Sequence, residues 1–313
     1  MRQPVHIFVN PNSHQGKGWK IWLSIEQEVL RLLPDARIIT TSKAEDLEAH
    51  LTPLVQAGLE TCIISAGGDG SIHSLVNRLL KCPGFDKSGI SLGAIGLGSS
   101  NDFLKPFHLM LNKVPVRINT TQPAKLRDAG IIKYIDGDGV WKEKYFIVNA
   151  SFGATSEGNW HFNNPGKILR WLKKVNTSAA ITYTAVSTIL SYRNKMVHLR
   201  YNDVEKRTRM SNINILKIPY VSGSLHYKQD ILPDDGKLGV NICINMRKHE
   251  LLQTLFQLQK GKFKLTEKNI SSYTDNFQLK SEKPIIFECD GETEVSTMIE
   301  ISVLPGAIRM LSS

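Results

Sequence analysis

The chain has 313 residues, 41% of them hydrophobic, and 39 Lys and Arg against 29 Asp and Glu give a formal net charge of +10. At about 100–200 residues per domain, this length predicts two domains with ample material for a buried core. No signal peptide, no run of roughly 20 apolar residues that could span a bilayer and no CxxC spacing occurs, so we expect a cytoplasmic protein without disulfides or a zinc site.

Strand and helix patterns alternate over the first 120 residues. We expect strands at 5–10, 36–40, 61–66 and 90–95, and helices at 19–33, 44–57 and 72–81, with another helix starting near Asn101. This alternation predicts a doubly wound parallel sheet, an α/β fold.

Strand patterns dominate the rest of the chain. Two helical stretches, 166–192 and 247–258, interrupt strands expected at 127–134, 144–151, 196–202, 211–218, 239–244, 276–280, 285–289 and 298–304. An antiparallel, β-sandwich-like domain fits this pattern. We therefore predict a first domain over 1–124 and a β-rich domain over 125–304.

The most informative loop follows the third strand and reads Gly67-Gly68-Asp69-Gly70-Ser71. Its glycines let the backbone approach a ligand closely, and the next helix would offer its N-terminus to phosphate. A carboxylate at a phosphate site needs a cation, so Asp69 implies Mg²⁺. The alternative interpretation is an ordinary strand–helix turn capped by Asp69.

Two more polar loops follow strands of the same domain. Asn10, Pro11 and Ser13 lie after the first strand, in a loop that is not a Walker A sequence, and Gly98-Ser99-Ser100-Asn101-Asp102-Phe103 follows the fourth. Loops at the C-terminal ends of parallel strands meet at one sheet edge, which is where open α/β sheets bind ligands.

Together these loops resemble the nucleotide site of the diacylglycerol kinase catalytic domain family, which includes bacterial soluble lipid kinases and the sphingosine and ceramide kinases. The resemblance continues in order through segments 126–130, 146–153, 232–238 and 290–292. It implies an ATP-binding first domain, to which residues 305–313 return, and a lipid-substrate domain. The implied nucleotide-binding residues are Asn10, Pro11, Ser13, Gly67, Gly68, Asp69, Gly70, Ser71, Gly98, Ser99, Asn101 and Asp102. Two positions depart from the family pattern, because His14 and Ser100 stand where glycine is usual.

The resemblance also implies the catalytic groups. Glu292, in Asp290-Gly291-Glu292, matches the family's catalytic Asp-Gly-Glu and would act as the general base, while Asp69 and Asp128 would hold the catalytic Mg²⁺. From the residues alone, Asp290-Gly291 is equally a hairpin turn between two strands.

A second carboxylate pair lies in the segment Leu232-Pro-Asp-Asp-Gly-Lys-Leu238. In resembling enzymes this loop can hold a structural Mg²⁺, for which Asp235 and the backbone of Leu238 are the matching groups. The alternative is a surface turn, since Pro-Asp-Asp-Gly is strong turn chemistry.

Positive charge gathers in residues 159–209, where ten Lys and Arg face only Asp203 and Glu205. Within this segment, the helix 168–174 mixes cationic and apolar residues and could lie on an anionic membrane. The alternatives are a nucleic acid partner, or a solvated helix whose apolar side packs on the β domain. We expect a peripheral membrane contact and no nucleic acid.

The sequence thus predicts an ATP- and Mg²⁺-dependent lipid kinase that phosphorylates diacylglycerol or a related lipid alcohol. One alternative is a NAD kinase-like enzyme, which shares Gly-Gly-Asp-Gly, although the Asn-Glu pair typical of NAD kinases is absent. Another is an inactive nucleotide or lipid sensor. The particular lipid and the oligomeric state stay open.

Overall fold

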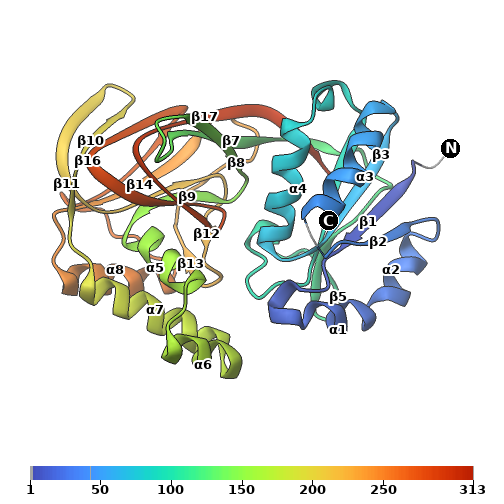
Figure 1. Ribbon diagram of the computed structural model, residues 1–313, viewed down its shortest axis with the longest axis horizontal. Coiled ribbons are helices and arrows are strands. Elements are labelled where there is room, and N and C mark those ends of the chain that lie inside the picture. Colours follow the sequence, from blue (N-terminus) through green and yellow to red (C-terminus); the bar gives the residue numbers. More distant parts are fainter. Residues whose placement is uncertain (1–2, 43, 313) are drawn as a thin grey trace. The chain divides into compact units, whose positions relative to one another are not determined.

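The computed structural model describes residues 3–42 and 44–312 (Figure 1). The chain divides into two compact units, Met1–Ala129 with Pro305–Ser313, and Gly130–Leu304. It leaves the first unit along β7 (Lys125–Ile135) and returns along β17 (Glu292–Met310). Below, these are called unit 1 and unit 2.

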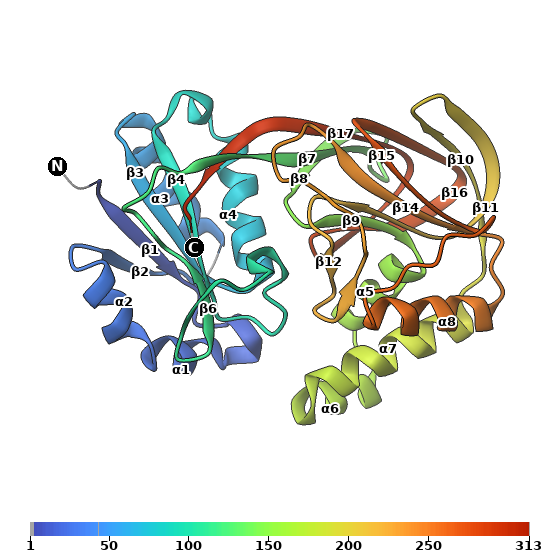
Figure 2. The ribbon, with the colours of Figure 1, turned by 180° about the vertical axis from the view of Figure 1, so that it is seen from behind.

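Unit 1 holds a parallel sheet in the order β2 (Arg37–Thr40), β1 (Val5–Val9), β3 (Thr61–Gly67) and β4 (Ile90–Gly96), seen from behind in Figure 2. Met310 at the end of β17 pairs in parallel with Leu92, and β6 (Val114–Arg117), which carries β5 (Leu109–Leu111), runs antiparallel to β4. Every residue of β3 and β4 is buried, as expected for central strands of a sheet covered on both faces.

The helices of unit 1 are α1 (Gly18–Leu23), α2 (Glu26–Leu32), α3 (Ala44–Gln56) and α4 (Asp69–Lys81). The single helix expected over 19–33 is divided, and at the break the Ser24 hydroxyl donates to the Ile21 carbonyl at 2.7 Å. The helix expected from Asn101 is only a short 3-10 turn, Asp102–Leu104, because Pro106 disfavours helical backbone at the residue before it.

Unit 2 is built around strands that pair in a closed ring: β9 (Asn149–Gly153) and β10 (Lys195–Tyr201) each pair with both β11 (Val204–Leu216) and β16 (Asn276–Cys289). Further strands are β8 (Trp141–Phe146), β14 (Leu238–Ile244) and β15 (Asn269–Thr274), with a small hairpin of β12 (Tyr220–Val221) and β13 (Leu225–His226). Large apolar side chains such as Phe152, Phe277 and Phe287 fill the core.

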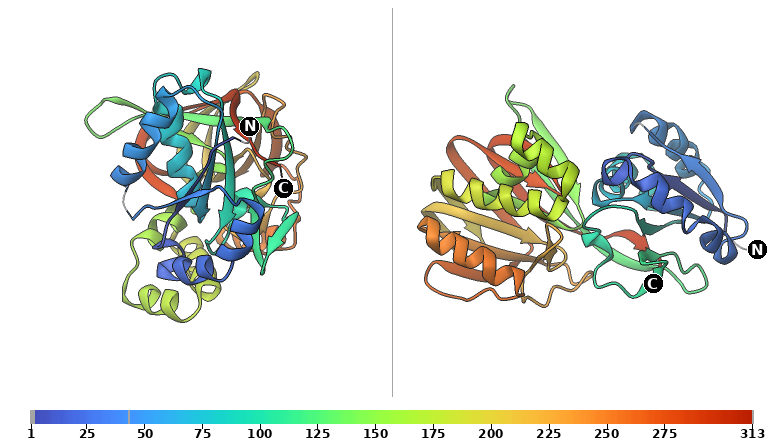
Figure 3. Two further views of the ribbon diagram at one scale, coloured as in Figure 1. Left: turned by 90° about the vertical axis from the view of Figure 1, so that its right-hand side faces the viewer. Right: turned by 90° about the horizontal axis from the view of Figure 1, so that it is seen from below.

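Helices α5 (Ala154–Asn163), α6 (Lys167–Val175), α7 (Thr177–Ser191) and α8 (Lys248–Gln259) gather on one side of unit 2 (Figure 3). The helix expected over 166–192 is therefore two helices, and Asn176 caps the second by accepting the Ala179 N–H at 3.0 Å. Helix α5 was not expected from the sequence. The predicted fold class, an α/β nucleotide-type domain with a β-sandwich-like domain, is confirmed.

Within residues 3–42 and 44–312, no helix combines the length and apolar character needed to cross a bilayer. All four cysteines are free thiols, and Cys62, Cys243 and Cys289 are buried.

Candidate functional site

The loops after β1 and β3 are joined by hydrogen bonds. The Asn10 side chain donates to the Ser71 hydroxyl at 2.9 Å, and the Asn10 backbone N–H donates to the Ala66 carbonyl at 2.9 Å. Ser13 is buried and donates to the Asn10 carbonyl at 2.9 Å. These contacts fix the first loop, including Pro11, beside the N-terminal turn of α4.

The loops after β3 and β4 pack backbone against backbone. A Cβ atom added at Gly98 would lie 2.6 Å from the Gly68 Cα atom, and one added at Gly67 would lie 2.3 Å from the Ser71 hydroxyl oxygen. The Leu97 N–H donates to the Gly67 carbonyl at 2.8 Å. Glycine is required at these positions because there is no room for a side chain.

Asn101 stabilises its own loop. It adopts a left-handed conformation with φ of 49°, its side-chain oxygen accepts the Gly98 N–H at 3.0 Å, and its amide donates to the carbonyls of Gly96 and Gly98 at 3.1 Å each. Asp102 is buried and forms an ion pair with Lys105 at 2.7 Å. In this structure both side chains hold the loop.

Helix α4 begins at Asp69, so Asp69, Gly70 and Ser71 form its first turn. The Asp69 carboxylate accepts the Phe103 N–H at 3.1 Å and thereby links the second and third loops. The structure thus brings three predicted loops to one edge of the unit 1 sheet, at the N-terminus of a 13-residue helix. Such an N-terminus attracts phosphate.

Asp128 also belongs to unit 1. It is 5% exposed on β7, and its carboxylate accepts the Gly306 N–H of the returning C-terminal segment at 2.9 Å. Mg²⁺ is commonly held by one or two carboxylates, water and substrate phosphates. Asp69 and Asp128 are carboxylates of this kind, and within 3–42 and 44–312 no cluster of three or more ligating side chains forms.

The Asp290-Gly291 pair forms the turn of the β16–β17 hairpin, with φ of 47° and 93°. The Asp290 carboxylate accepts the N–H groups of Ile147, Val148 and Asn149 at 2.9, 3.0 and 2.9 Å. It therefore anchors the turn to the link between β8 and β9, and it divides the strand expected over 144–151.

Glu292, the first residue of β17, is half-exposed, with 51% of its side chain accessible. It accepts from Lys144 at 3.1 Å, and Lys144 also donates to Glu294 at 2.7 Å. Burial lowers the pKa of Lys144, but its bonds to Glu294 and Glu292 outweigh burial and raise that pKa above its usual range. The ammonium therefore stays charged beside the Glu292 carboxylate.

Glu288, two residues before the turn, is a buried acid that the sequence analysis missed. It is 1% exposed and accepts from Ser151 at 2.5 Å, from Asn149 at 2.9 Å and from the Gly291 N–H. Burial raises the pKa of Glu288 to about 7. The alternation of strand side chains places this position on the polar face of β16, but it does not reveal that the face is buried.

The Leu232–Leu238 loop already holds a positively charged group. The Lys217 side chain is 2% exposed, and its ammonium donates to the carbonyls of Lys237 at 2.9 Å and Leu232 at 3.3 Å, with Asp235 at 3.8 Å. Of the two groups predicted for a structural Mg²⁺, the Asp235 carboxylate thus already faces a buried ammonium. This positive charge would repel a metal ion at Asp235, which disfavours the predicted site.

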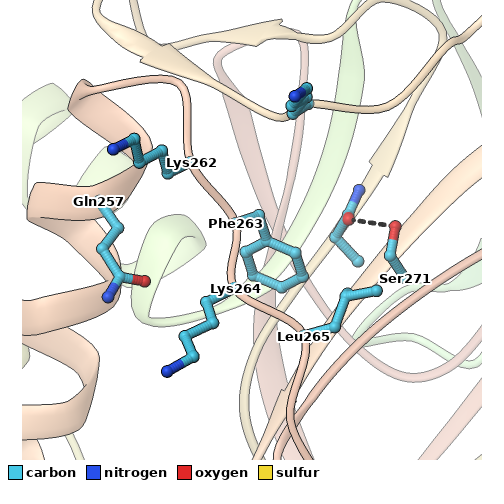
Figure 4. Close-up of a pocket in the computed structure, with 8 residues that line it drawn as sticks. Gln257, Lys262, Phe263, Lys264, Leu265 and Ser271 are labelled. Atoms are coloured by element: carbon cyan, nitrogen blue, oxygen red, sulfur yellow. Dashed lines mark hydrogen bonds between the residues drawn. The ribbon is translucent and has the colours of Figure 1, made fainter.

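A cavity of about 430 Å³ lies in unit 2 (Figure 4). None of the residues predicted for the functional site lines it, and its lining includes Lys228, Lys262, Lys264, Asn241 and Ser271. We assign it no role in the predicted site.

Two family models match consecutive parts of the chain. The diacylglycerol kinase catalytic domain matches residues 4–134, and the YegS C-terminal NAD kinase beta sandwich-like domain matches residues 166–312. Residues 4–134 thus form a domain of the diacylglycerol kinase catalytic domain family, and the relatives that match this chain include proteins named as lipid kinases.

Individual relatives are distant but extend over the whole chain. A Staphylococcus carnosus protein whose name places it among the lipid kinases is 21% identical over 99% of this chain and 98% of its own length. Sphingoid long chain base kinase 4 of Schizosaccharomyces pombe is 23% identical over 96% of this chain and 72% of its own. A diacylglycerol kinase structure from Bacillus anthracis superposes with a TM-score of 0.69 at 16% identity, covering 99% and 97% of the two chains, which shows a shared fold.

Proposed function

We propose that the protein is an ATP- and Mg²⁺-dependent kinase that transfers the γ-phosphate to a hydroxyl of diacylglycerol or a related lipid alcohol. The observation that carries this proposal is the junction of three loops at the α4 N-terminus, held by the Asn10–Ser71 bond, the Gly68–Gly98 approach and the Asp69–Phe103 bond. The family match of residues 4–134 and the relatives named as lipid kinases support it.

In this proposal, unit 1 binds the nucleotide. The backbone at Gly67, Gly68 and Gly70 faces the phosphates, and Ser71 and Asn10 hold the loops that carry them. Ser99, which is exposed, offers a hydroxyl to the nucleotide. Asp69 and Asp128 would hold Mg²⁺, which on binding neutralises charge on the phosphates.

Glu292 then removes the proton from the acceptor hydroxyl as the general base. Its carboxylate is accessible and lies in a fixed hairpin, and the Lys144 ammonium stabilises its charged form. A general base contributes about 10²–10⁴-fold to the rate. Lys144 is therefore a positioning residue, which directs one oxygen of Glu292.

The test uses γ-labelled ATP, Mg²⁺ and a panel of lipid alcohols in mixed micelles: diacylglycerol, monoacylglycerol, a sphingoid base and phosphatidylglycerol. We expect label on one of these lipids with the wild-type protein and about 10²-fold less with Glu292→Gln. Glu294→Gln is the matched control, because Glu294 also contacts Lys144 but lies outside the turn. Full turnover by Glu292→Gln would refute the assignment of the base.

The same assay includes NAD as an acceptor, because the C-terminal family model is named after the NAD kinase sandwich and yeast NADH kinase shares the fold at a TM-score of 0.51. Label on NAD would replace the lipid proposal with a NAD kinase-like function. Binding of ATP with no labelled product in any tube would indicate a nucleotide sensor.

The proposal includes a peripheral membrane contact through α6. Its exposed apolar side chains, Ile168, Trp171 and Val175, are 63%, 63% and 66% accessible and recur at helical spacing on one face. Only Leu169 of this helix is buried. The accessibility of Ile168, Trp171 and Val175 favours the membrane contact over the alternative in which the apolar side of the helix packs on the β domain.

Cationic side chains from Lys167, Arg170 and Lys174 lie beside that apolar face, which is the composition of a helix at an anionic interface. We expect the protein to sediment with phosphatidylglycerol vesicles and less with phosphatidylcholine vesicles. Burial of a large apolar side chain is worth about 1.5–3 kcal/mol, so Trp171→Ser should weaken vesicle binding about tenfold. Leu59→Ser removes an equally exposed apolar residue of unit 1 and should leave binding unchanged.

A further inference from the structure

The buried carboxylate of Glu288 lies directly behind the turn that carries Glu292. Cys289 of β16 pairs with Glu292 of β17, and Asp290 and Gly291 connect the two strands. The Glu288 carboxylate accepts the N–H of Gly291, the residue immediately before Glu292. This bond ties the inside of unit 2 to the exposed end of the hairpin.

The carboxylate is surrounded by donors that favour its ionised form. Ser151 and Asn149 of β9 donate to one oxygen, and Gly291 donates to the other. A protonated carboxyl would itself be a donor on one oxygen, so at least one of these three bonds would be lost. The network is complete only when Glu288 is charged.

Glu288 is the charged member of a row of polar side chains across the unit 2 sheet. Strand register places it opposite Ser151, which lies opposite Asn214, which lies opposite Asn241. All four side chains are buried, and the other three are neutral. The charge of Glu288 therefore has little solvent to stabilise it and depends on its hydrogen bonds.

Within residues 3–42 and 44–312, the charged groups near Glu288 do not supply a compensating cation. Asp290 in the adjoining turn adds a negative charge, and the neighbouring Cys289 thiol is buried with its pKa raised. Lys144 is engaged with Glu292 and Glu294, and on α5 Glu157 pairs with Lys195 at 2.5 Å. The α5 side chains near the turn, Ser156 and Asn163, are neutral and bond to the carbonyls of Ile286 and Gly291.

We propose that Glu288 is a positioning residue for the proposed base: its ionised carboxylate, held by Ser151 and Asn149, fixes the Gly291 peptide and so orients the Glu292 side chain. This inference rests on the proposed function of Glu292. Because burial raises the pKa of Glu288 to about 7, the turn changes with pH in the neutral range. Protonation of Glu288 releases the Gly291 N–H and lowers activity.

The first test follows the turn without any turnover, so it is independent of the proposed kinase activity. In protein labelled with ¹⁵N-glycine, the Gly291 amide resonance should titrate with a midpoint near pH 7, and Glu288→Gln should abolish that titration. Ser151→Ala removes a donor that favours the charged form, so the midpoint should move to higher pH. A Gly291 resonance that is constant from pH 5.5 to 8.5 in the wild-type protein would overturn the proposal.

The second test compares pH profiles of kcat/KM on the lipid that the wild-type protein phosphorylates. The wild-type profile should rise towards high pH with a limb near pH 7, Ser151→Ala should move this limb upward, and Glu288→Gln should remove it. A constant loss at every pH in Glu288→Gln, with the limb retained, would mean a merely structural role. If no lipid is phosphorylated, the proposed function fails, while the Gly291 titration still tests the coupling of the turn to Glu288.

Discussion

The buried ammonium of Lys217 lies beside Asp235, at which the sequence predicted a structural metal ion, and its removal has a predictable cost. Lys217→Met keeps the aliphatic stem and removes the charge, which leaves the carbonyls of Leu232 and Lys237 without this donor and Asp235 without its cation. A hydrogen bond from a charged group is worth about 1.5–3 kcal/mol, so the loss of two should lower the free energy of unfolding by about 3–6 kcal/mol. At about 2–4 °C per kcal/mol for a unit of this size, Tm should fall by roughly 6–24 °C.

Scanning calorimetry without nucleotide measures the Tm of the wild-type and Lys217→Met proteins, once in EDTA and once in excess Mg²⁺. The wild-type Tm should be the same in both buffers, because the ammonium already fills the loop. Lys237→Met is the matched control, since Lys237 is an exposed lysine of the same loop and its loss should leave Tm unchanged. A wild-type Tm that rises with Mg²⁺ but is unaffected by Asp235→Ala would place the metal elsewhere. A rise that Asp235→Ala abolishes, or a Lys217→Met protein as stable as wild type, would refute the reasoning.

Three further outcomes are expected. The pKa of Glu288 is about 7 in the fold against an ordinary 4.5, so its contribution to stability is present below pH 4.5 and is lost as the pH rises to about 7. At about 1.36 kcal/mol per pH unit, the wild-type protein should lose about 3 kcal/mol of stability relative to Glu288→Gln between pH 4.5 and 7.5. Calorimetry over this range measures the difference, and parallel stability curves for the two proteins would contradict the prediction. Gly98→Ala should lower Tm and nucleotide affinity, because its Cβ would press on the Gly68 Cα atom at 2.6 Å at a cost of about 1–3 kcal/mol, whereas Gly70→Ala meets no atom within 4 Å and should keep its Tm. Asp69→Asn still offers an oxygen to the Phe103 N–H, so Tm should hold while activity and its response to Mg²⁺ fall about 10²-fold; unchanged Mg²⁺ dependence would exclude Asp69 as a metal ligand.

The sequence predicted β1, β3 and β4 of unit 1 closely because these strands are almost entirely buried, whereas it missed the short strands β5 and β6. A mostly apolar run such as Cys62–Ala66 has few alternatives once glycines follow it. The helix breaks were harder, since they depend on single local events. The Ser24–Ile21 bond divides α1 from α2, and the Asn176 cap divides α6 from α7 within an otherwise helical pattern.

The functional loops were found from glycine and polar residues at strand ends, but the contacts between loops lie beyond sequence reasoning. No pattern in the chain reveals that the Asp69 carboxylate binds the Phe103 N–H, because 34 residues separate them. The same holds for Lys217 and Glu288. Periodicity marks both residues as polar positions in predicted strands. Only their burial in the folded protein makes Lys217 a cation inside the Leu232–Leu238 loop and Glu288 an acid with a raised pKa.

The two departures from the family pattern have unequal consequences for the nucleotide loops. Serine in place of glycine at position 100 causes no backbone strain, because the left-handed residue of this loop is the next one, Asn101. Asn101 tolerates φ of 49°, and its side-chain amide closes the loop. His14 is different, because it adopts φ of 50° itself, at a cost of roughly 1–2 kcal/mol for a non-glycine residue. His14→Gly should therefore keep nucleotide binding, and Asn101→Ala should weaken it by opening the third loop. Equilibrium binding of ATP to both variants measures these affinities. Weaker binding by His14→Gly than by Asn101→Ala would contradict the prediction and show that nucleotide binding depends on the strained His14.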